Sequence, residues 1–310
     1  MTVLRWTAAG LLLASLAAGT IGDVPRGHPR LMLGGYRVLA ADFHVHSFPL
    51  SWATLAPWDT AMEAQRQGLD AIAIVGHNHV CGRTGILACP GALAGGPLIL
   101  TGEEIVSAHY HLLAIGIDST IDWRQSAASA IEEIHRQGGA AIAAHPLAQY
   151  WPAYGAQARR ALDGAEVVHP VAYENGGFAA QLRQFYNSAP LTAIGDSDYH
   201  GLGPIGLCRT YVFTKDETQQ GILDALRHGR TVVYDRAGRP YGDAALIRLA
   251  AADGRLPEGA PHAGFLSLFS RIAGVLGLIA VACGADHRFL WSALRAGGQT
   301  TQTDRLPHSQ

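Results

Sequence analysis

The chain has 310 residues and a mass of 32.8 kDa, which is enough to bury one sizeable hydrophobic core. Its formal net charge is −2, and its lysines and arginines form no cluster, which excludes DNA and RNA as expected partners. Charged residues make up 15% of the chain, below the roughly 25% of an average soluble domain, which indicates that some of the apolar sequence lies in lipid.

The N-terminal segment is apolar. One positive charge, Arg5, precedes an uncharged run over residues 7–22, which is the layout of a secretory signal peptide or of a signal-anchor helix. Small residues at 17–19 are compatible with cleavage, so both alternatives stay open. We assign residues 1–35 to a signal or anchor with its linker. The chain is therefore expected to be exported to the periplasm or the cell exterior.

Residues 36–250 alternate apolar β-rich runs with helical patterns. The runs with strand character are 37–47, 69–76, 97–107, 110–118, 140–145, 165–169, 191–198, 209–214 and 231–234. The helical patterns are 60–68, which opens with a capping box at Thr60 and Glu63, followed by 126–137, 178–188 and 219–228. This order predicts a parallel sheet covered by helices on both faces, or a closed β/α barrel.

A second apolar stretch, residues 263–284, is long enough for a membrane span of about 20 residues, although Arg271 interrupts it. A transmembrane helix and an amphipathic helix lying on a membrane or on the barrel are both compatible with this pattern. Arg288, Arg295 and Arg305 favour a cytoplasmic C-terminus, because positive charge is enriched on cytoplasmic flanks. Residues 251–310 are therefore expected to form an apolar helix and tail that tether the chain to a membrane.

Histidines and acids recur at the ends of the predicted strands. His44 and His46 lie one strand step apart, on the face that Asp42 shares. The later strands end near a larger set: His77, Glu103, Glu104, His109, His111, His145, His169, Asp196, Asp198 and His200. One such histidine is more often a hydrogen-bonded core or surface residue than a metal ligand. Recurrence at the carboxyl ends of strands, where β/α barrels hold their active sites, favours a shared metal site.

The mixture of imidazoles and carboxylates also limits the choice of metal. It suits Zn²⁺, Mn²⁺ or Fe²⁺, whereas a Ca²⁺ site would use oxygen ligands alone. No Gly-rich phosphate loop and no Gly-x-Ser-x-Gly elbow is present, so chemistry through a serine nucleophile is not expected.

Four short motifs carry a family resemblance: Asp42-Phe43-His44-Val45-His46-Ser47, Gly68-Leu69-Asp70-Ala71-Ile72-Ala73-Ile74 leading to His77-Asn78, Ala144-His145-Pro146 and Ser197-Asp198-Tyr199-His200. Together they resemble the polymerase and histidinol phosphatase (PHP) superfamily over roughly residues 38–234. Two further motifs look like the CehA/McbA-type metallohydrolases within it: Thr101-Gly102-Glu103-Glu104-Ile105 and His111-Leu112-Leu113. The resemblance implies a distorted (β/α)7 barrel over residues 36–250 with a metal cluster.

The resemblance also implies a set of metal ligands: His44, His46, His77, Glu104, His111, His145, Asp198 and His200. In this set Glu104 is the bridging carboxylate. The adjacent Glu103 should point to the other side of its strand, and His79 and His109 are at most contacts of the ligands. His169 ends another predicted strand and is a candidate for substrate contact.

Two departures from the family pattern affect the number of metals. The family usually has Asp directly before the histidine at position 77, where this chain has Gly76, and a further ligand shortly after the His-x-His pair, where residues 48–52 offer none. We therefore expect two divalent ions, with one or three as alternatives.

The expected activity is hydrolysis of a small phosphate ester by metal-activated water, with His200, Asp198 or His169 passing a proton to the leaving group. Two alternatives stay open. One is carbamate or aryl ester hydrolysis of the CehA type, and the other is a degenerate metal-binding sensor or scaffold without catalysis. The partner implied by the first two is a small-molecule substrate.

Overall fold

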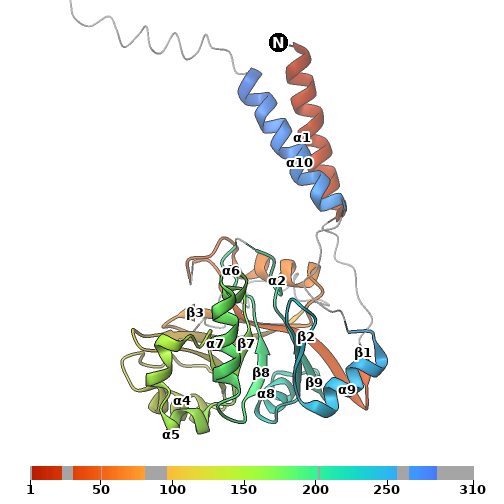
Figure 1. The fold of residues 1–310 in the computed structure, drawn as a ribbon. Coiled ribbons are helices and arrows are strands. Elements are labelled where there is room, and N and C mark those ends of the chain that lie inside the picture. Colours follow the sequence, from red (N-terminus) through yellow and green to blue (C-terminus); the bar gives the residue numbers. More distant parts are fainter. Residues whose placement is uncertain are drawn as a thin grey trace, which may run out of the picture. The chain divides into compact units, whose positions relative to one another are not determined.

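The computed structural model describes residues 2–22, 31–49, 51–80, 96–201, 203–256 and 265–284 (Figure 1). The chain divides into two compact units, one comprising Pro25–His262 and the other combining Met1–Val24 with Ala263–Gln310. All of the candidate site residues lie in the first unit. The three tail arginines, Arg288, Arg295 and Arg305, lie outside the described residues.

The first unit is built on one sheet of 11 strands. Its strands are β1 (Leu31–Leu33), β2 (Tyr36–Val45), β3 (Ala71–His77), β4 (Leu98–Val106), β5 (His111–Ile115), β6 (Ala140–Ala143), β7 (Gly164–Val168), β8 (Thr192–Gly195), β9 (Thr210–Thr214), β10 (Thr231–Tyr234) and β11 (Pro240–Gly242). Each of the runs predicted from sequence forms one of these strands. Only β1 and β11 were not predicted, because three residues are too few to reveal an alternating pattern.

The sheet is mixed, with the strand order β11-β10-β9-β2-β3-β4-β5-β6-β7-β8. Strands β2, β3 and β4 run parallel, as do β6, β7 and β8, but β5 is antiparallel to both of its neighbours. The expectation of a regular β/α repeat is therefore wrong at β4 and β5. Val106 pairs directly with His111, and so short a turn can join only antiparallel strands.

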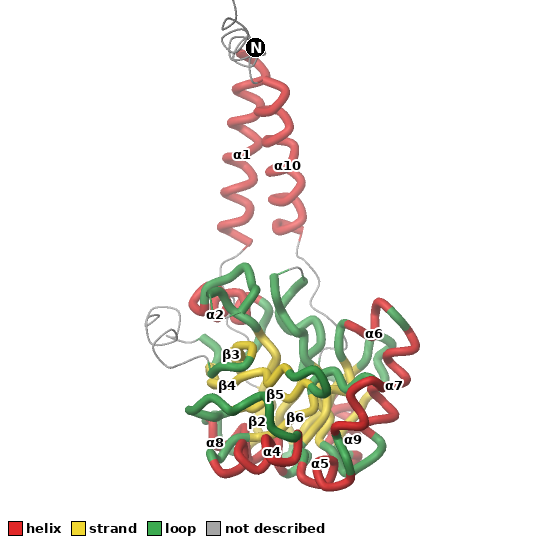
Figure 2. The backbone as a smooth tube through the Cα atoms, turned by 90° about the vertical axis from the view of Figure 1, so that its left-hand side faces the viewer, coloured by secondary structure: helices red, strands yellow, loops and turns green. Residues whose placement is uncertain are grey.

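The sheet curls until its ends nearly meet. The hydroxyl of Thr231 on β10 donates to the carbonyl oxygen of Ala193 on β8 at 2.7 Å, and the backbone N–H of Gly195 donates to the Thr210 hydroxyl at 2.9 Å. These side-chain hydrogen bonds hold β8 beside β9 and β10 without a backbone ladder between them. The result is a nearly closed, barrel-like α/β sheet, in agreement with the expected barrel type (Figure 2).

Helices cover the outside of this sheet and its amino end. They are α2 (Pro57–Arg66), α4 (Ala127–Arg136), the 3₁₀ helix η1 (Ala148–Ala153), α5 (Ala156–Ala161), α6 (Val171–Glu174), α7 (Gly176–Tyr186), α8 (Gln219–Arg227) and α9 (Ala244–Asp253). Ser126 caps α4, where its hydroxyl accepts from the Ser129 N–H at 3.2 Å. The predicted capping box at Thr60 is wrong, because α2 already begins at Pro57, and a proline suits the first helical position.

Alternate side chains along the strands divide the core into inner and outer layers. On β3, Ala73 and Val75 belong to the interior cluster, whereas Ile72 and Ile74 pack on the other side of the sheet. Leu223 and its neighbours on α8 add apolar side chains to the interior cluster. The Thr192 hydroxyl donates to the carbonyl oxygen of Leu226, which places α8 at the amino end of β8. The interior is therefore sealed by apolar packing at that end.

The second unit contains two helices side by side, α1 (Thr2–Gly22) and α10 (Phe265–Gly284). The Ser15 hydroxyl donates to the Ser270 carbonyl oxygen at 2.7 Å, and the Ser270 hydroxyl donates to the Ser15 carbonyl oxygen at 2.8 Å. Gly277 permits close packing, since a Cβ there would lie 2.8 Å from Cγ of Leu12. These small residues let the two helix backbones approach each other.

Within the described residues, we find no helix whose length and apolarity together suffice to cross a membrane. The anchor predicted for the N-terminal segment and the span predicted for residues 263–284 are therefore not supported. In α10 the exposed Arg271 interrupts the apolar surface, as it does in the sequence.

Candidate metal centre

The predicted ligands meet at one edge of the sheet, where the carboxyl ends of the parallel strands lie beside the amino end of the antiparallel β5. The residues come from seven places in the sheet: His44 from β2 and His46 directly after it, His77 from β3, Glu104 from β4, His111 from β5, His145 after β6, and Asp198 and His200 after β8, with His169 following β7. The imidazole centroids of His46 and His200 are 4.1 Å apart, and those of His46 and His77 are 4.4 Å apart. Residues separated by more than 150 positions therefore share one small volume.

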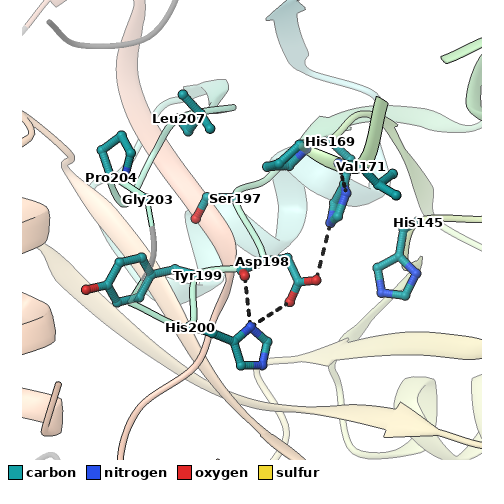
Figure 3. A pocket seen from close by; sticks show the side chains of 11 residues that line it. His145, His169, Val171, Ser197, Asp198, Tyr199, His200, Gly203, Pro204 and Leu207 are labelled. Carbon is teal, nitrogen blue, oxygen red and sulfur yellow. Dashed lines mark hydrogen bonds and ion pairs between the residues drawn. The ribbon is translucent and has the colours of Figure 1, made fainter. Parts of the chain in front are cut away.

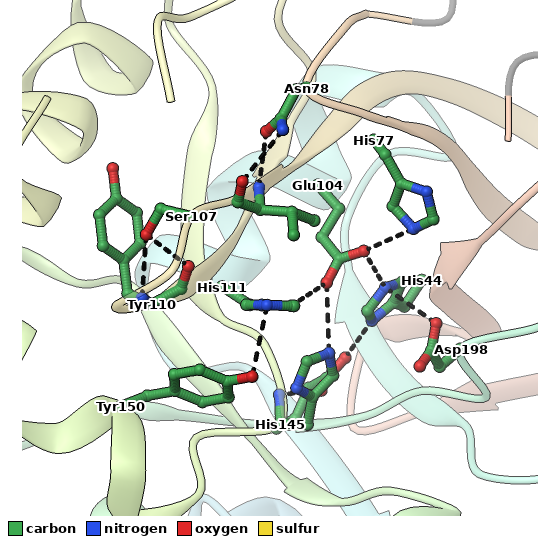
Figure 4. A network of polar contacts seen from close by, with 12 residues as sticks. His44, His77, Asn78, Glu104, Ser107, Tyr110, His111, His145, Tyr150 and Asp198 are labelled. Atoms are coloured by element: carbon green, nitrogen blue, oxygen red, sulfur yellow. Dashed lines mark hydrogen bonds and ion pairs between the residues drawn. The ribbon is translucent and has the colours of Figure 1, made fainter. Parts of the chain in front are cut away.

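The carboxylate of Glu104 lies at the middle of this cluster (Figure 4). Its Oε2 lies 3.4 Å from Nε2 of His44, 3.4 Å from Nε2 of His46 and 3.2 Å from Nε2 of His77. Its Oε1 lies 2.9 Å from Nδ1 of His111 and 3.2 Å from Nε2 of His145. One carboxylate thus faces five imidazoles, which is the arrangement expected of an acid that bridges cations.

Asp198 faces two of these imidazoles as well, those of His44 and His46. Its Oδ1 lies 3.2 Å from Nε2 of His44 and 3.3 Å from Nε2 of His46. The same oxygen is 3.4 Å from Nδ1 of His200, and Oδ2 is 3.7 Å from Nε2 of His169. The two carboxylates therefore share His44 and His46 in one group of four ligand atoms.

The electrostatics keep both acids charged. Burial alone would raise the pKa of Glu104, but the charge of His44 and the hydrogen bonds to His111 and His145 hold that pKa well below its usual range. Burial likewise opposes the charge of Asp198, and His44 and His46 outweigh it, so the pKa of Asp198 is also lowered. A divalent cation would replace the protons on these imidazoles as the partner of both carboxylates.

The donor set fits metal ions. Among the described residues, four overlapping groups have ligand atoms within 4.8 Å of one another: His44 with His145 and His169; His46 with His77 and His200; His44, His46, Glu104 and Asp198; and Glu104 with His111 and His145. Within the described part of the chain, Nε2 of His44, Nε2 of His46 and Oδ1 of Asp198 are buried without a hydrogen-bond partner. Such atoms are costly unless a ligand satisfies them, and a cation would do so.

Glu166 on β7 belongs to the site and was missed by the sequence analysis. Its Oε1 lies 2.8 Å from Nδ1 of His44, and its Oε2 accepts from the backbone N–H of His145. The visible signal was an acidic residue inside the otherwise apolar run at residues 165–168. Strict alternation would separate Glu166 from His169, but the pairing register of β7 with β8 shifts between Glu166 and Val168. Both side chains therefore reach the cluster.

Ser51 was also missed. Its hydroxyl lies 3.0 Å from Nδ1 of His46, and it accepts from the backbone N–H of His77 at 3.3 Å. The loop after the His-x-His pair thus contributes a residue that orients a candidate ligand, although it supplies no histidine or acid.

Asp42 does not join the histidines, contrary to the expectation from alternation. It accepts from the N–H and the hydroxyl of Ser197, at 3.1 and 2.5 Å, and from the N–H of Gly206 at 2.8 Å. The pairing register of β2 with β3 shifts after Asp42, which accounts for the lost alternation. Asp42 instead fixes the backbone that leads to Asp198.

Three non-glycine residues in the described ranges have positive φ, and all three lie at the site. These are Asn78 at 58°, His145 at 26° and Asp198 at 47°. Such conformations are unfavourable for residues with a Cβ and tend to occur at functional sites. The chain therefore holds His145 and Asp198 in strained positions directly after β6 and β8.

The remaining sequence candidates lie outside the cluster. Glu103 is fully buried on the other side of β4, where one oxygen accepts from the N–H of Ile121 at 2.9 Å. His109 lies in the exposed turn before β5. His79 approaches the backbone of His77, with Nδ1 2.9 Å from its carbonyl oxygen, and fills the space beside Gly76.

His169 borders a cavity of about 540 Å³ next to the cluster (Figure 3). Its Nδ1 accepts from the N–H of Val171 at 3.1 Å, which leaves Nε2 directed toward Glu166 and Asp198. Burial lowers the pKa of His169 to about 4, so its imidazole is neutral at neutral pH. Asp198 and His200 border the same cavity.

Three comparisons with known proteins found similarities to this chain. Residues 180–231 match the family described as PHP-associated. A two-domain protein from Bacteroides vulgatus, which contains a predicted PHP-like metal-dependent phosphoesterase, is 25% identical, with a TM-score of 0.58 and coverage of 74% of each chain. An uncharacterized protein from Methanocaldococcus jannaschii is 28% identical over 157 residues, which is 46% of this chain and 88% of that protein.

These similarities support the PHP superfamily and a PHP-type fold. Together with the His and Glu cluster, they support metal-dependent hydrolysis as the class of reaction and a divalent metal as the cofactor. They identify neither the substrate nor the metal. The CehA/McbA-type subgroup suggested by the motifs around Glu104 and His111 stays a prediction.

Proposed function

We propose that the protein is a metal-dependent phosphoesterase that hydrolyses a small phosphate ester. The substrate would bind in the cavity lined by Asp198, His169 and His200. The observation that carries this proposal is the placement of Glu104 among five imidazoles, with Asp198 opposite. The similarity to the Bacteroides vulgatus protein adds support for the reaction class.

The ligand set favours Zn²⁺, Mn²⁺ or Fe²⁺ over Ca²⁺, because it mixes imidazole nitrogens with only a few carboxylate oxygens. We propose two ions that share Glu104 as a ligand. His44, His46, His77 and Asp198 would hold the ion on one side of this carboxylate, and His111 and His145 the ion on the other, which leaves Nε2 of His200 for proton transfer.

Bound divalent ions would supply an activated water and stabilise negative charge on the phosphoryl oxygens. Glu166 and Ser51 hold His44 and His46 in fixed orientations through the second ring nitrogen of each. These contacts preorganise both imidazoles for a cation.

The chain also offers groups that move protons. His200 is half-exposed at the cavity, and its Nδ1 lies 3.0 Å from the carbonyl oxygen of Asp198, so Nε2 is left for the solvent side. Burial and the neighbouring His46 lower its pKa, which keeps it neutral and able to accept a proton at neutral pH. We assign His200 the transfer of a proton from the attacking water to the leaving group, with the carbonyl oxygen of Asp198 orienting its ring. His169 carries its proton on Nε2, because its Nδ1 accepts from the N–H of Val171, so we assign it a hydrogen bond to the substrate.

A substrate panel tests the proposal. Protein purified without chelator is assayed with phosphomonoesters, phosphodiesters and aryl carbamates, beside His44→Ala and a matched control, His228→Ala, which alters an exposed histidine far from the cluster. We expect phosphate ester hydrolysis by the wild type and the control and a loss of at least about 100-fold in His44→Ala.

Two results would overturn this assignment. Hydrolysis of carbamates alone would indicate carbonyl chemistry. A divalent metal content near zero, with no hydrolysis after metal is added, would indicate a scaffold.

We further propose that the enzyme acts outside the cytoplasm, in the periplasm or at the cell exterior. The support is the layout of the N-terminal segment, where Arg5 precedes the uncharged run of residues 7–22. Fractionation of cells that express the full chain tests this location, and recovery of all of the protein in the cytosol would refute it.

A further inference from the structure

The cavity beside the metal centre has two kinds of wall (Figure 3). On one side, Asp198 and His169 present the polar atoms of the cluster. Much of the remaining lining is apolar, with Val171 from α6 and Pro204 and Leu207 from the segment after β8. These three residues are half-buried, so their side chains still have surface available to a ligand. The cavity volume of about 540 Å³ lies within the range of small-molecule sites.

The lining contains no lysine and no arginine among the residues that the structure describes. An anionic group seated against Val171 or Leu207 would therefore lose its water without gaining a positive partner, which is unfavourable. Among the described lining residues, a negative charge is best accommodated at the cluster itself, where cations would bind.

The Ser197 hydroxyl beside the apolar wall is already engaged, because it donates to Asp42 at 2.5 Å. A leaving group rich in hydroxyls, such as a sugar, would find few free partners on this wall. An apolar leaving group would lose little by entering and would gain from burial against Val171, Pro204 and Leu207.

We propose that the preferred substrates are phosphate monoesters whose leaving group is uncharged and mainly apolar, with that group seated on Val171, Pro204 and Leu207. This inference rests on the phosphoesterase activity proposed above. It specifies that the phosphoryl group is held by the metal side of the cavity and that selectivity comes from the apolar side.

A homologous substrate series tests the proposal with the metal-loaded full chain. The series comprises ethyl, butyl and hexyl phosphate, with glycerol 1-phosphate and 3-phosphoglycerate as polar and anionic comparators. We expect kcat/KM to rise by at least about tenfold from ethyl to hexyl phosphate, since each buried methylene favours binding. Both comparators should be hydrolysed more slowly than butyl phosphate.

Two matched variants locate the selectivity. Leu207→Lys places a cation in the lining and should flatten the alkyl series while raising the relative rate on 3-phosphoglycerate by about tenfold. Met32→Lys introduces the same lysine at an exposed position on β1 and should retain the substrate preference of the wild type. The metal content and melting temperature of both variants are measured beside the kinetics.

The outcomes separate the two proposals. Hydrolysis of phosphate esters with a flat alkyl series, or with 3-phosphoglycerate preferred by the wild type, would overturn the apolar leaving-group assignment and leave the phosphoesterase assignment standing. An unchanged profile in Leu207→Lys would also overturn it. Absence of hydrolysis of every phosphate ester would refute both.

Discussion

Glu166 contacts His44 at the ring nitrogen that points away from the cluster, with Oε1 of the carboxylate 2.8 Å from Nδ1 of the imidazole and both side chains fully buried. This contact fixes the ring so that Nε2 faces Glu104 and Asp198, at 3.4 and 3.2 Å. Carboxylates in this position commonly orient histidine ligands and increase their basicity. Glu166 also accepts from the N–H of His145, so one acid positions two candidate ligands.

Replacement of this acid should weaken metal binding. Glu166→Gln keeps one acceptor oxygen, so one of the two contacts, to His44 or to the His145 N–H, is lost. We expect the affinity for the divalent ion to fall by about 10- to 100-fold, measured by competition with a chromophoric chelator. Glu132→Gln, at an exposed position on α4, is the matched control. An affinity equal to that of the wild type would show that Glu166 does not orient the ligand.

Metal removal should lower the stability of the first unit. Without a cation, the buried Nε2 atoms of His44 and His46 have no hydrogen-bond partner in the described part of the chain. A ligand present at 100 times its Kd stabilises the folded state by about 2.7 kcal/mol, so the melting temperature should fall after chelation and recover when metal is restored. His44→Ala should show a much smaller response. The same response in both proteins would place the stabilising metal elsewhere.

Gly76 should resist substitution for a steric reason. A Cβ at this position would lie 2.6 Å from the carbonyl oxygen of His79 and 2.8 Å from its Nε2. Gly76→Ala is therefore expected to destabilise the protein by about 1–3 kcal/mol in urea unfolding. Gly155→Ala is the control, because nothing lies within 4 Å of its added Cβ and its φ is −60°. Equal stabilities of the two variants would contradict the close packing of His79.

Glu103 should make stability depend on pH. Burial raises the pKa of Glu103 from 4.5 to about 7, so the folded state binds this proton more tightly than the unfolded state. The contribution of Glu103 to the free energy of unfolding is complete below pH 4.5. It falls by up to about 3 kcal/mol as the pH rises to 7, where the buried acid begins to ionise. Glu103→Gln cannot ionise, so its stability relative to the wild type should increase between pH 5 and pH 8. Unfolding curves with parallel pH profiles would argue against a buried neutral acid.

The strands and many of the site positions were predictable because they depend on local patterns. Apolar runs identified β2 to β10, and parallel strands place their carboxyl ends at one edge of a sheet. Histidines that directly follow such apolar runs are therefore expected at the same edge of the sheet. For this reason His44, His77 and His145 could be grouped from their positions alone. The family resemblance indicated Glu104, and alternation predicted that the adjacent Glu103 points to the other side of the strand, which agrees with their opposite placement.

The tertiary structure alone decided how these residues are held. Glu166 contacts His44 across 122 positions, and the register shifts after Asp42 and after Glu166 change which side chains reach the cluster. Local periodicity cannot reveal such features, because they arise from the pairing of strands that are distant in sequence. The sequence by itself determined which residue types stand at the strand ends. The closure of the sheet determined which of them meet, which are oriented by Glu166 and Ser51, and which cavity lies beside them, since these depend on long-range packing.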